Sequence, residues 1–399
     1  MLCSFLLFAH GTYDIISLIS FSGGSMKKLL LIIVLVSVTA VTVVGLLVGL
    51  FSAQPSNKTN ITQEEEMMEQ QNSKAEQVTE ALTSSASATI EATATPTPKD
   101  ALTATPTPVV TFFGSEEIDA TSSKFMSAME ISLLCPTTAN SVNPDVTYGT
   151  VVHHTYQSKT TGLERGVNVL VPAGYDANKK YPVLYLLHGI FGNEYSFTND
   201  PNMQIETITG NMIASGETED MIVVFPDMFA KTRADHEPGF NFESYFAYDN
   251  FINDLVNDLI PFMEANYSVM TDREHRAIAG FSMGGRESLF IMVTRPDLFA
   301  YCTAFAPAPG LTPGKDFGGE HPGQLQEAEL RIKDMQYMPK ILMVDCGNHD
   351  SVVGKFPLSY HNIMLENQVN HIWYEVPDAD HDSKTIQSGY YNFLRYVFK

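Results

Sequence analysis

Hydrophobic and polar positions follow two different periods along the second half of the chain. Residues 165–171 alternate, as expected for a strand with one covered face. Residues 251–263 and 390–397 carry apolar side chains at helical spacing. Continuous apolar runs, typical of strands covered on both faces, occupy residues 182–187 and 221–225. Further strand-like segments occupy residues 301–305, 341–344 and 371–376. Strands that alternate with helices predict an α/β fold, with a mostly parallel central sheet and helices on both faces.

The amino-terminal part has the pattern of a membrane anchor. A basic pair after Met26 precedes residues 29–51, which contain no charged side chain. As a helix this segment is about 34 Å long, enough to cross the hydrocarbon core of a bilayer. Cleavable signal peptides have shorter apolar cores, so we predict a transmembrane signal-anchor over 26–51, with cleavage near residue 52 and secretion as the alternative. The lysines predict a cytoplasmic amino terminus and an extracellular remainder. We interpret 1–25 as a misassigned start or a cytoplasmic extension.

Residues 52–138 have the composition of a linker. Acidic, Ser, Thr and Ala residues dominate, and the pentapeptide Ala-Thr-Pro-Thr-Pro occurs at 94–98 and again at 104–108. Such a segment cannot bury enough apolar surface to fold, and its prolines favour extended conformations. We therefore predict a disordered linker over 52–138 and a folded domain over 139–399. Residues 109–135 are more apolar, which leaves their packing against the domain open.

Charge and cysteine content exclude several classes of function. The net charge of −22 disfavours nucleic acid and anionic membrane surfaces as partners, because neither attracts a chain of this sign. The four cysteines show no spacing typical of a disulfide framework or a metal knuckle. Cys302 and Cys346 lie in apolar runs, and we interpret them as buried packing residues.

The segment Gly280-Phe281-Ser282-Met283-Gly284 fits the Gly-x-Ser-x-Gly pattern of a nucleophile elbow. In this motif a strand enters a helix through a turn so tight that the glycines must leave room for it, and the serine projects alone. Residues 275–279 form a short run suited to a buried strand, and 286–292 contain no Gly or Pro and suit a helix. We predict Ser282 as a nucleophile, against the alternative of a serine in a Gly-rich turn.

A nucleophilic serine needs a base, usually His, and the His needs a carboxylate to fix its tautomer. In this architecture the chain order is Ser, then Asp or Glu, then His. His381 lies in a polar loop between the last strand-like run and the terminal helix, so we predict it as the base, with His349 as the alternative. Asp350, in the loop after the strand-like run 341–344, is the predicted acid, and Asp345 is the alternative.

Other ionisable residues nearby receive structural interpretations. His361 and His371 fall within a helix and at the start of a strand, and both are interpreted as structural. Asp378, Asp380 and Asp382 are interpreted as solvated loop charges.

The oxyanion that forms during acyl transfer needs two hydrogen-bond donors. One is predicted to be the backbone N–H of Met283, directly after the nucleophile. The other is predicted in the loop after the strand-like run that ends at Leu187, with Ile190 first and Phe191 as the alternative. His188 is interpreted as ordering this loop. The loss of one such donor typically costs about 2.7–4 kcal/mol of transition-state stabilisation.

With these residues, the chain resembles the esterase D-like esterase family, and within it the feruloyl esterase domains of bacteria that degrade plant cell walls, grouped as carbohydrate esterase family 1. The resemblance covers about residues 145–399. It is carried by the elbow and by segments 181–189, 271–280, 346–350 and 381–382. It implies an α/β-hydrolase fold, a catalytic triad of Ser282, Asp350 and His381, and no metal or organic cofactor.

The segment 227–247 departs from the family because it is longer and richer in aromatic residues, namely Phe229, Phe240, Phe242, Tyr245 and Phe246. Loops at the carboxyl ends of strands build the pocket in such folds. We expect Phe191, Phe240 and Phe242 to contact a phenolic acyl group, against the alternative that these rings only pack the loop onto the domain.

The expected function is hydrolysis of feruloyl or related hydroxycinnamoyl esters on plant xylan by an extracellular, membrane-anchored enzyme. Its partner is then a polysaccharide-linked ester. Acetyl xylan esterase, siderophore esterase of the enterochelin type and acyltransferase remain open among enzymes. A catalytically silent carbohydrate-binding module remains open outside them.

Overall fold

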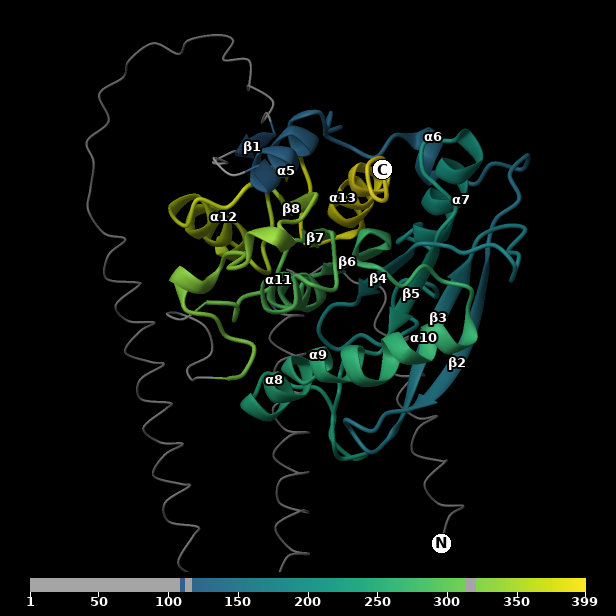
Figure 1. Cartoon of the computed structure of the whole chain (residues 1–399), viewed down its shortest axis with the longest axis horizontal. Helices are drawn as coiled ribbons and strands as arrows, with labels where there is room; N and C mark the ends of the chain where they lie inside the picture. Colours follow the sequence, from purple (N-terminus) through teal and green to yellow (C-terminus); the bar gives the residue numbers. More distant parts are fainter. Residues whose placement is uncertain (1–107, 112–116, 313–320) are drawn as a thin grey trace, which may run out of the picture. The chain divides into compact units, whose positions relative to one another are not determined.

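The computed structural model describes residues 108–111, 117–312 and 321–399, and these ranges form a single mixed sheet covered by helices (Figure 1). The order of the strands across the sheet is β1-β9-β8-β7-β6-β4-β5-β3-β2. Their bounds are β1 Val109–Thr111, β2 Thr150–Gln157, β3 Glu164–Val171, β4 Val183–Leu187, β5 Ile222–Pro226, β6 Arg276–Phe281, β7 Tyr301–Phe305, β8 Ile341–Gly347 and β9 His371–Val376.

The central strands, from β5 through β4, β6, β7 and β8 to β9, run parallel, whereas β1, β2 and β3 are antiparallel to their neighbours. Every residue of β4, β5, β7 and β8 is buried, which explains their continuous apolar runs. The edge strand β2 is mostly exposed. The predicted mostly parallel sheet with helices on both faces is confirmed, and the arrangement is α/β-hydrolase-like.

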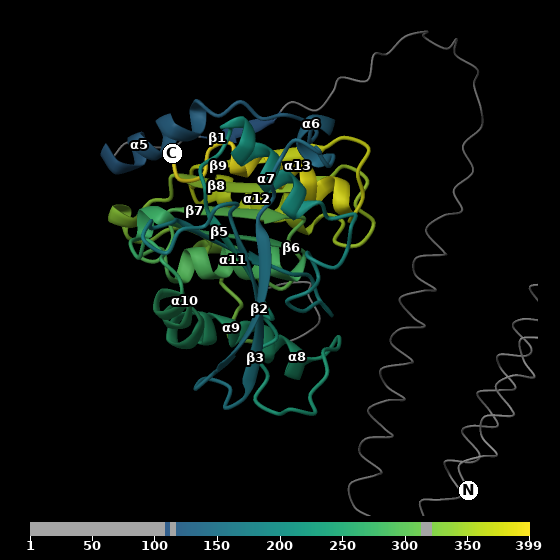
Figure 2. The ribbon, with the colours of Figure 1, turned by 90° about the vertical axis from the view of Figure 1, so that its right-hand side faces the viewer.

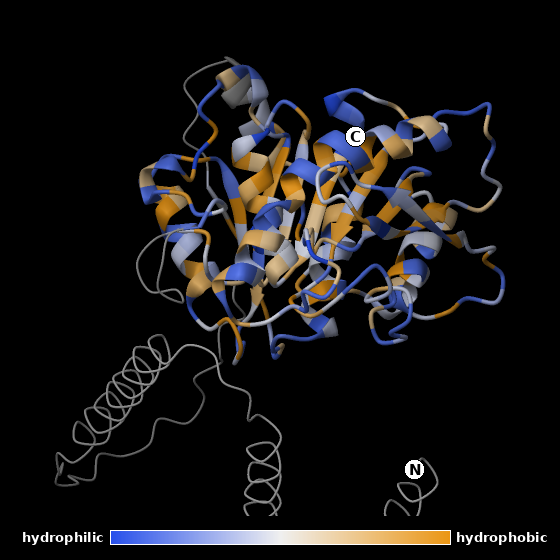
Figure 3. Cartoon of the chain, turned by 90° about the horizontal axis from the view of Figure 1, so that it is seen from below, coloured by the Kyte–Doolittle hydropathy of each residue, from blue (hydrophilic) through white to orange (hydrophobic). Residues whose placement is uncertain are grey.

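Two hydrophobic clusters cover the two faces of the sheet (Figure 2). One face carries α8 Phe242–Asp249, α9 Phe251–Asp254, a π-helical turn Leu255–Leu259, α10 Ile260–Asn266, α11 Met283–Thr294 and α12 Phe356–Glu366. The other carries α5 Glu117–Ser127, α6 Thr137–Asn140, α7 Ile205–Ser215 and α13 Ser383–Leu394. Figure 3 shows apolar positions concentrated in the central strands and the helix faces packed on them.

The predicted boundary between linker and domain at residue 139 is too late. Strand β1 pairs with β9 at the edge of the sheet, with Val109 opposite Trp373. Met126 of α5 is fully buried, and the backbone N–H of Ser132 donates to Asn392 Oδ1 at 2.8 Å. The described residues from 108 to 138 therefore belong to the domain. Strand β1 extends the sheet at its β9 edge, and Met126 and Met129 pack in the same hydrophobic cluster as α13.

The predicted extension 1–25, the predicted anchor 26–51 and the linker up to residue 107 lie outside the described residues. Among the helices that are described, none has the length and apolar character needed to cross a membrane.

A buried histidine at the start of β9 predicts a loss of stability in mild acid. His371 donates its Nδ1–H to the carbonyl of Val369 at 2.7 Å, so its Nε2 accepts from His361 Nδ1 at 2.8 Å. Burial lowers the pKa of His371 to about 4. Between pH 6.5 and 4 the unfolded chain binds a proton that the folded ring does not bind. Folding should therefore lose about 3 kcal/mol as the pH falls through this window.

Denaturant unfolding of the wild type and of His371→Gln between pH 7 and 4 measures this effect. The substitution should flatten the dependence on pH. An equal slope in the wild type and His371→Gln would contradict the assignment.

Candidate active site

The turn between β6 and α11 places Ser282 in a strained conformation. Its φ and ψ are 56° and −116°, a region that residues other than glycine rarely occupy. The turn is held by backbone hydrogen bonds, with the N–H of Ser282 donating to Phe305 O and its carbonyl accepting from Ala308 N, both at 2.9 Å. Strain of this kind is typical of a nucleophile elbow, where the helix must begin immediately after the serine.

The glycines of the motif are required by close backbone contacts. A Cβ on Gly280 would lie 2.3 Å from the carbonyl carbon of Gly284, and one on Gly284 would lie 2.2 Å from Leu187 O. Neither contact can be relieved by a side-chain rotation, because both neighbours are backbone atoms. The first turn of α11 therefore rests directly on the ends of β6 and β4.

The loops after β8 and β9 bring Asp350 and His381 together. His381 Nδ1 lies 2.8 Å from Asp350 Oδ2, and both side chains are largely buried. Asp350 Oδ1 accepts the backbone N–H groups of Val352 at 2.9 Å and Val353 at 2.8 Å. Burial opposes ionisation of Asp350, but these hydrogen bonds, with that to His381 first, lower its pKa below the usual value. Asp350 is thus an ionised acceptor that fixes the tautomer with Nε2 unprotonated.

The imidazole of His381 lies beside the elbow. Its ring centroid is 4.3 Å from that of Phe281, the residue before Ser282. The structure therefore brings together the three elements that carry Ser282, Asp350 and His381, in the chain order expected for this architecture.

The alternative residues occupy other places. Asp345 is fully buried, and within the described residues neither of its carboxylate oxygens has a hydrogen-bond partner. Burial raises its pKa well above the usual value, which favours the neutral acid. Its side chain points at α13, since a Cβ on Gly389 would lie 2.3 Å from its Oδ2. His349 is exposed, and its backbone N–H donates to Ala379 O.

A cysteine is part of the acid's surroundings. The thiol of Cys346 donates to Asp350 Oδ2 at 3.5 Å, and the same oxygen faces His381. The interpretation of Cys346 as a packing residue is therefore incomplete, because it is buried and also contacts the acid. The residues around Cys346 in the sequence give no indication of this contact, because it depends on how the loop after β8 turns back.

The loop after β4 reaches the nucleophile. A Cβ on Gly189 would lie 3.5 Å from the Cβ of Ser282. The N–H of Phe191 donates to Tyr248 Oη at 3.1 Å, and this residue has a positive φ of 65°. In the described part of the chain, the N–H groups of Ile190 and Met283 enter no hydrogen bond. The contacts thus favour Ile190 over Phe191 as the second donor, beside Met283 at the start of α11.

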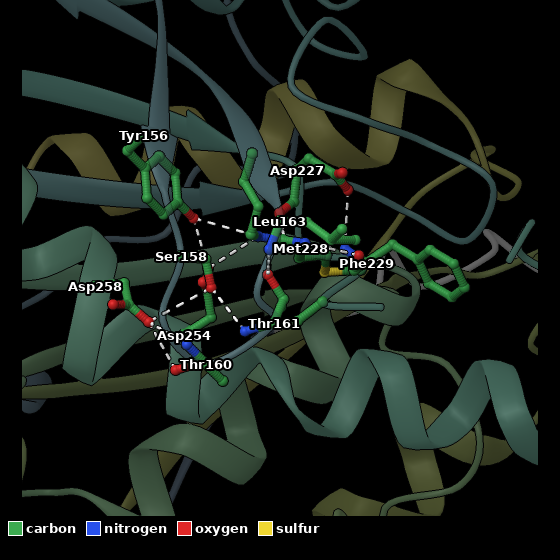
Figure 4. Close-up of polar contacts among 12 residues, drawn as sticks. Tyr156, Ser158, Thr160, Thr161, Leu163, Asp227, Met228, Phe229, Asp254 and Asp258 are labelled. Atoms are coloured by element: carbon green, nitrogen blue, oxygen red, sulfur yellow. Dashed lines mark hydrogen bonds and ion pairs between the residues drawn. The ribbon is translucent and has the colours of Figure 1, made fainter. Parts of the chain in front are cut away.

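Buried polar groups hold this loop in place. His188 donates Nδ1–H to Gly189 O at 2.7 Å, and its Nε2 accepts from the N–H of Met228 at 3.0 Å. Arg165 binds the adjacent Phe229 carbonyl through Nη1 at 2.9 Å and Asp254 through Nε at 3.1 Å. Figure 4 shows the polar contacts around Met228 and Phe229, and it also labels Asp254. The contacts agree with the interpretation that His188 orders the loop.

The aromatic residues of segment 227–247 divide into two groups. Phe229 and Tyr245 are buried and pack the segment onto the domain, whereas Phe242 and Phe246 are exposed. Phe240 is 68 % exposed and meets Phe191 edge to face, with ring centroids 5.1 Å apart. The packing alternative therefore describes the first group. Phe240 of this segment and Phe191 of the loop after β4 form an exposed aromatic pair. Among the described residues, no three His, Cys, Asp or Glu side chains are grouped to hold a metal ion.

Curated relatives contain a related segment within longer chains. The chain is 34 % identical over 206 residues to endo-1,4-beta-xylanase Y of Acetivibrio thermocellus, which is 48 % of this chain and 17 % of that protein. It is 31 % identical over 217 residues to an endo-1,4-beta-xylanase/feruloyl esterase of Xylanibacter ruminicola, which is 53 % of this chain and 26 % of that protein. The match thus spans about a quarter or less of either relative.

Solved structures match the domain over most of its length. A CE1 ferulic acid esterase from Anaeromyces mucronatus, solved in complex with ferulic acid, is 47 % identical with a TM-score of 0.64, and the match covers 68 % of this chain and 98 % of that one. A feruloyl esterase module from Clostridium thermocellum, complexed with sinapinate, is 22 % identical with a TM-score of 0.51 over 68 % of this chain and 94 % of that one, which supports the fold alone.

A family model described as "Putative esterase" matches residues 158–380, more than half of the chain, and this range contains Ser282 and Asp350 and ends directly before His381. The chain belongs to this esterase family.

Proposed function

We propose that the protein is a serine feruloyl esterase, which hydrolyses hydroxycinnamoyl esters of plant cell-wall xylan. The observation that carries this proposal is the pairing of His381 with Asp350 beside the strained Ser282, in a chain 47 % identical to a ferulic acid esterase. Two relatives that contain a related segment are named as endo-1,4-beta-xylanases, one of them also as a feruloyl esterase, and these names support a polysaccharide-linked substrate.

In the proposed mechanism, Ser282 Oγ attacks the ester carbonyl while His381 Nε2 takes its proton. Asp350 keeps Nδ1 protonated and stabilises the imidazolium. The oxyanion accepts hydrogen bonds from the N–H groups of Met283 and Ile190. The intermediate then collapses, His381 returns its proton to the sugar oxygen that leaves, and the acyl group stays on Ser282. Water, deprotonated by His381, attacks this acyl-enzyme. The bond between the acyl carbon and Ser282 Oγ then breaks, His381 returns the proton to Ser282 Oγ, and the free acid leaves.

The assignment of the acid gives the first test of this mechanism. Asp350→Asn should lower kcat for methyl ferulate by about 10⁴, because the amide favours the wrong tautomer of His381. Asp345→Asn, at a carboxyl that is already neutral, should leave kcat within a few-fold of wild type. Steady-state kinetics of both variants, with Ser282→Ala as the inactive control, distinguishes them. A dead Asp345→Asn beside an active Asp350→Asn would reverse the assignment.

The acyl group is proposed to pack against Phe191 and Phe240. A phenolic ring in contact with this pair gains roughly 0.5–1.5 kcal/mol beyond the burial of its surface. Phe242 follows at the start of α8 and is exposed on the same segment, which favours its contact with a larger substrate. An acetyl group offers no ring, so acetyl xylan esterase activity would gain nothing from these residues.

Substrate preference tests this part of the proposal. Phe240→Ala should raise KM for methyl ferulate by about two- to tenfold and leave the KM of a small acetyl ester unchanged. Phe246→Ala is the matched control, because it too removes an exposed ring, here from α8. A wild-type preference for acetylated xylan would move the assignment to acetyl xylan esterase. Labelling of Ser282 by a fluorophosphonate without turnover of either ester would favour a siderophore ester, or transfer to another acceptor.

We also propose that residues 26–51 anchor the enzyme in the cell membrane, with the linker carrying the domain outside the cell. The uncharged segment after the basic pair supports this location. The protein should then fractionate with membranes, and protease added to whole cells should release an active fragment by cutting before residue 108. Full-length enzyme in the cytoplasmic fraction would contradict the proposal. Active enzyme in the medium that lacks its amino-terminal segment, without added protease, would favour secretion.

A further inference from the structure

Asp380 connects the loop that carries the acid to the loop that carries the base. One of its oxygens, Oδ1, accepts the backbone N–H of Ser351 at 2.7 Å and the backbone N–H of His381 at 2.8 Å. The hydroxyl of Ser351 donates to both carboxylate oxygens, at 3.0 and 3.1 Å. Ser351 directly follows Asp350, so the carboxylate contacts the neighbours of both members of the pair. Asp380 is exposed, as its sequence context indicates, but its carboxylate also bridges the two loops.

The sheet explains why such a connection is needed. The nucleophile follows β6, whereas the base follows β9, which lies three strands away across β7 and β8. Three strand spacings amount to about 14 Å, so the loop after β9 must turn back toward the elbow. Asp378, with a φ of 51°, starts this turn. Near the strands the two loops are joined by backbone contacts, such as His349 N–H to Ala379 O at 3.0 Å.

Beyond that contact, side chains hold the two loops together. The Asp350–His381 hydrogen bond is one link and the Asp380 carboxylate is the other. We propose that Asp380 is a positioning residue, whose carboxylate sets the spacing and orientation of Asp350 and His381 through the backbone N–H groups of Ser351 and His381.

The hydrogen bonds from Ser351 and His381 lower the pKa of Asp380, so the carboxylate is ionised at neutral pH. An ionised acceptor makes stronger hydrogen bonds than a neutral one. Thr385 donates to the carbonyl of Asp380 at 2.8 Å, and this contact does not depend on the side chain. A change at the carboxylate therefore removes the link between the loops and leaves the backbone anchor on α13 in place.

The test measures kcat and KM for methyl ferulate together with the rate of fluorophosphonate labelling of Ser282, in the full chain. Asp380→Ala should lower kcat and the labelling rate by about tenfold or more, with KM within about twofold, because a small displacement of the base costs turnover rather than binding. Asp380→Asn should recover most of this loss, because its amide oxygen can still accept both N–H groups. Ser351→Ala should lose about two- to fivefold, as expected for the hydroxyl contact alone.

The matched control is Asp378→Asn, which removes a charge from the same loop at a residue that tolerates its positive φ. It should behave as wild type. Equal kcat in Asp380→Ala and Asp378→Asn would overturn the proposal, as would an Asp380→Asn variant as impaired as Asp380→Ala. If Asp380→Ala does not fold, wild-type kcat in Ser351→Ala would count against the proposal, and a loss in kcat alone would support it.

This proposal rests on the serine esterase mechanism, but it can fail separately. Absence of ester turnover and of labelling in the wild type would remove the proposed function itself. Normal wild-type turnover with unaffected Asp380 variants would remove only the role of Asp380.

Discussion

The geometry of the whole site depends on close backbone contacts that the first turn of α11 makes with β6 and with the end of β4. Gly280 and Gly284 approach so closely that neither position has room for a Cβ, and Gly284 rests on the carbonyl of Leu187. This contact forces the strand to enter the helix at a single residue, which places Ser282 in its strained conformation. It also brings the start of α11 beside the loop after β4, since a Cβ on Gly284 would lie 2.6 Å from His188 O.

Parallel strands then decide which residues can meet this serine. Phe281, Phe305 and Asp345 lie in one row across β6, β7 and β8, so the loops that follow these strands emerge at the same edge. A strand residue such as Asp345 points to one face of the sheet and is covered by α13. A loop residue such as Asp350 is free to turn over the edge, which is why it meets His381.

The same distinction explains how much of the molecule could be predicted from its sequence. The sheet and the elbow were predictable because apolar runs and close glycine spacing report local constraints. The order Ser, Asp, His and the place of each loop favoured Asp350 over Asp345 and His381 over His349, and the structure brings Asp350 and His381 together. The contact of Cys346 with Asp350 and the bridge made by Asp380 join segments far apart in the chain, so no local pattern records them. The start of the domain was misplaced because β1 depends on the free edge of β9 rather than on its own composition.

The aromatic segment after β5 shows how buried charge supports an exposed binding surface. At its start, Arg165 is paired with Asp254 and binds the carbonyl of Phe229. Past its end, Asp249 at the end of α8 is paired with Arg286, which lies one turn after the nucleophile and is fully buried. Both pairs are shielded from water. The loss of Arg165 or Asp254 would leave a buried charge without its ionic partner and cost about 3–5 kcal/mol. In the second pair, Arg286 also contacts Glu287 and Asp249 also contacts His321.

Such pairs add little net stability compared with well-packed apolar residues, but they tolerate few alternative geometries. The segment is therefore fixed at both ends, while Phe240 in its middle is exposed and contacts Phe191 edge to face. Arg286 also donates its backbone N–H to the carbonyl of Ser282. A displacement of the aromatic segment would therefore also displace the backbone at Ser282. Arg286 thus connects the aromatic segment, which we propose selects the acyl group, to the turn that carries the proposed nucleophile.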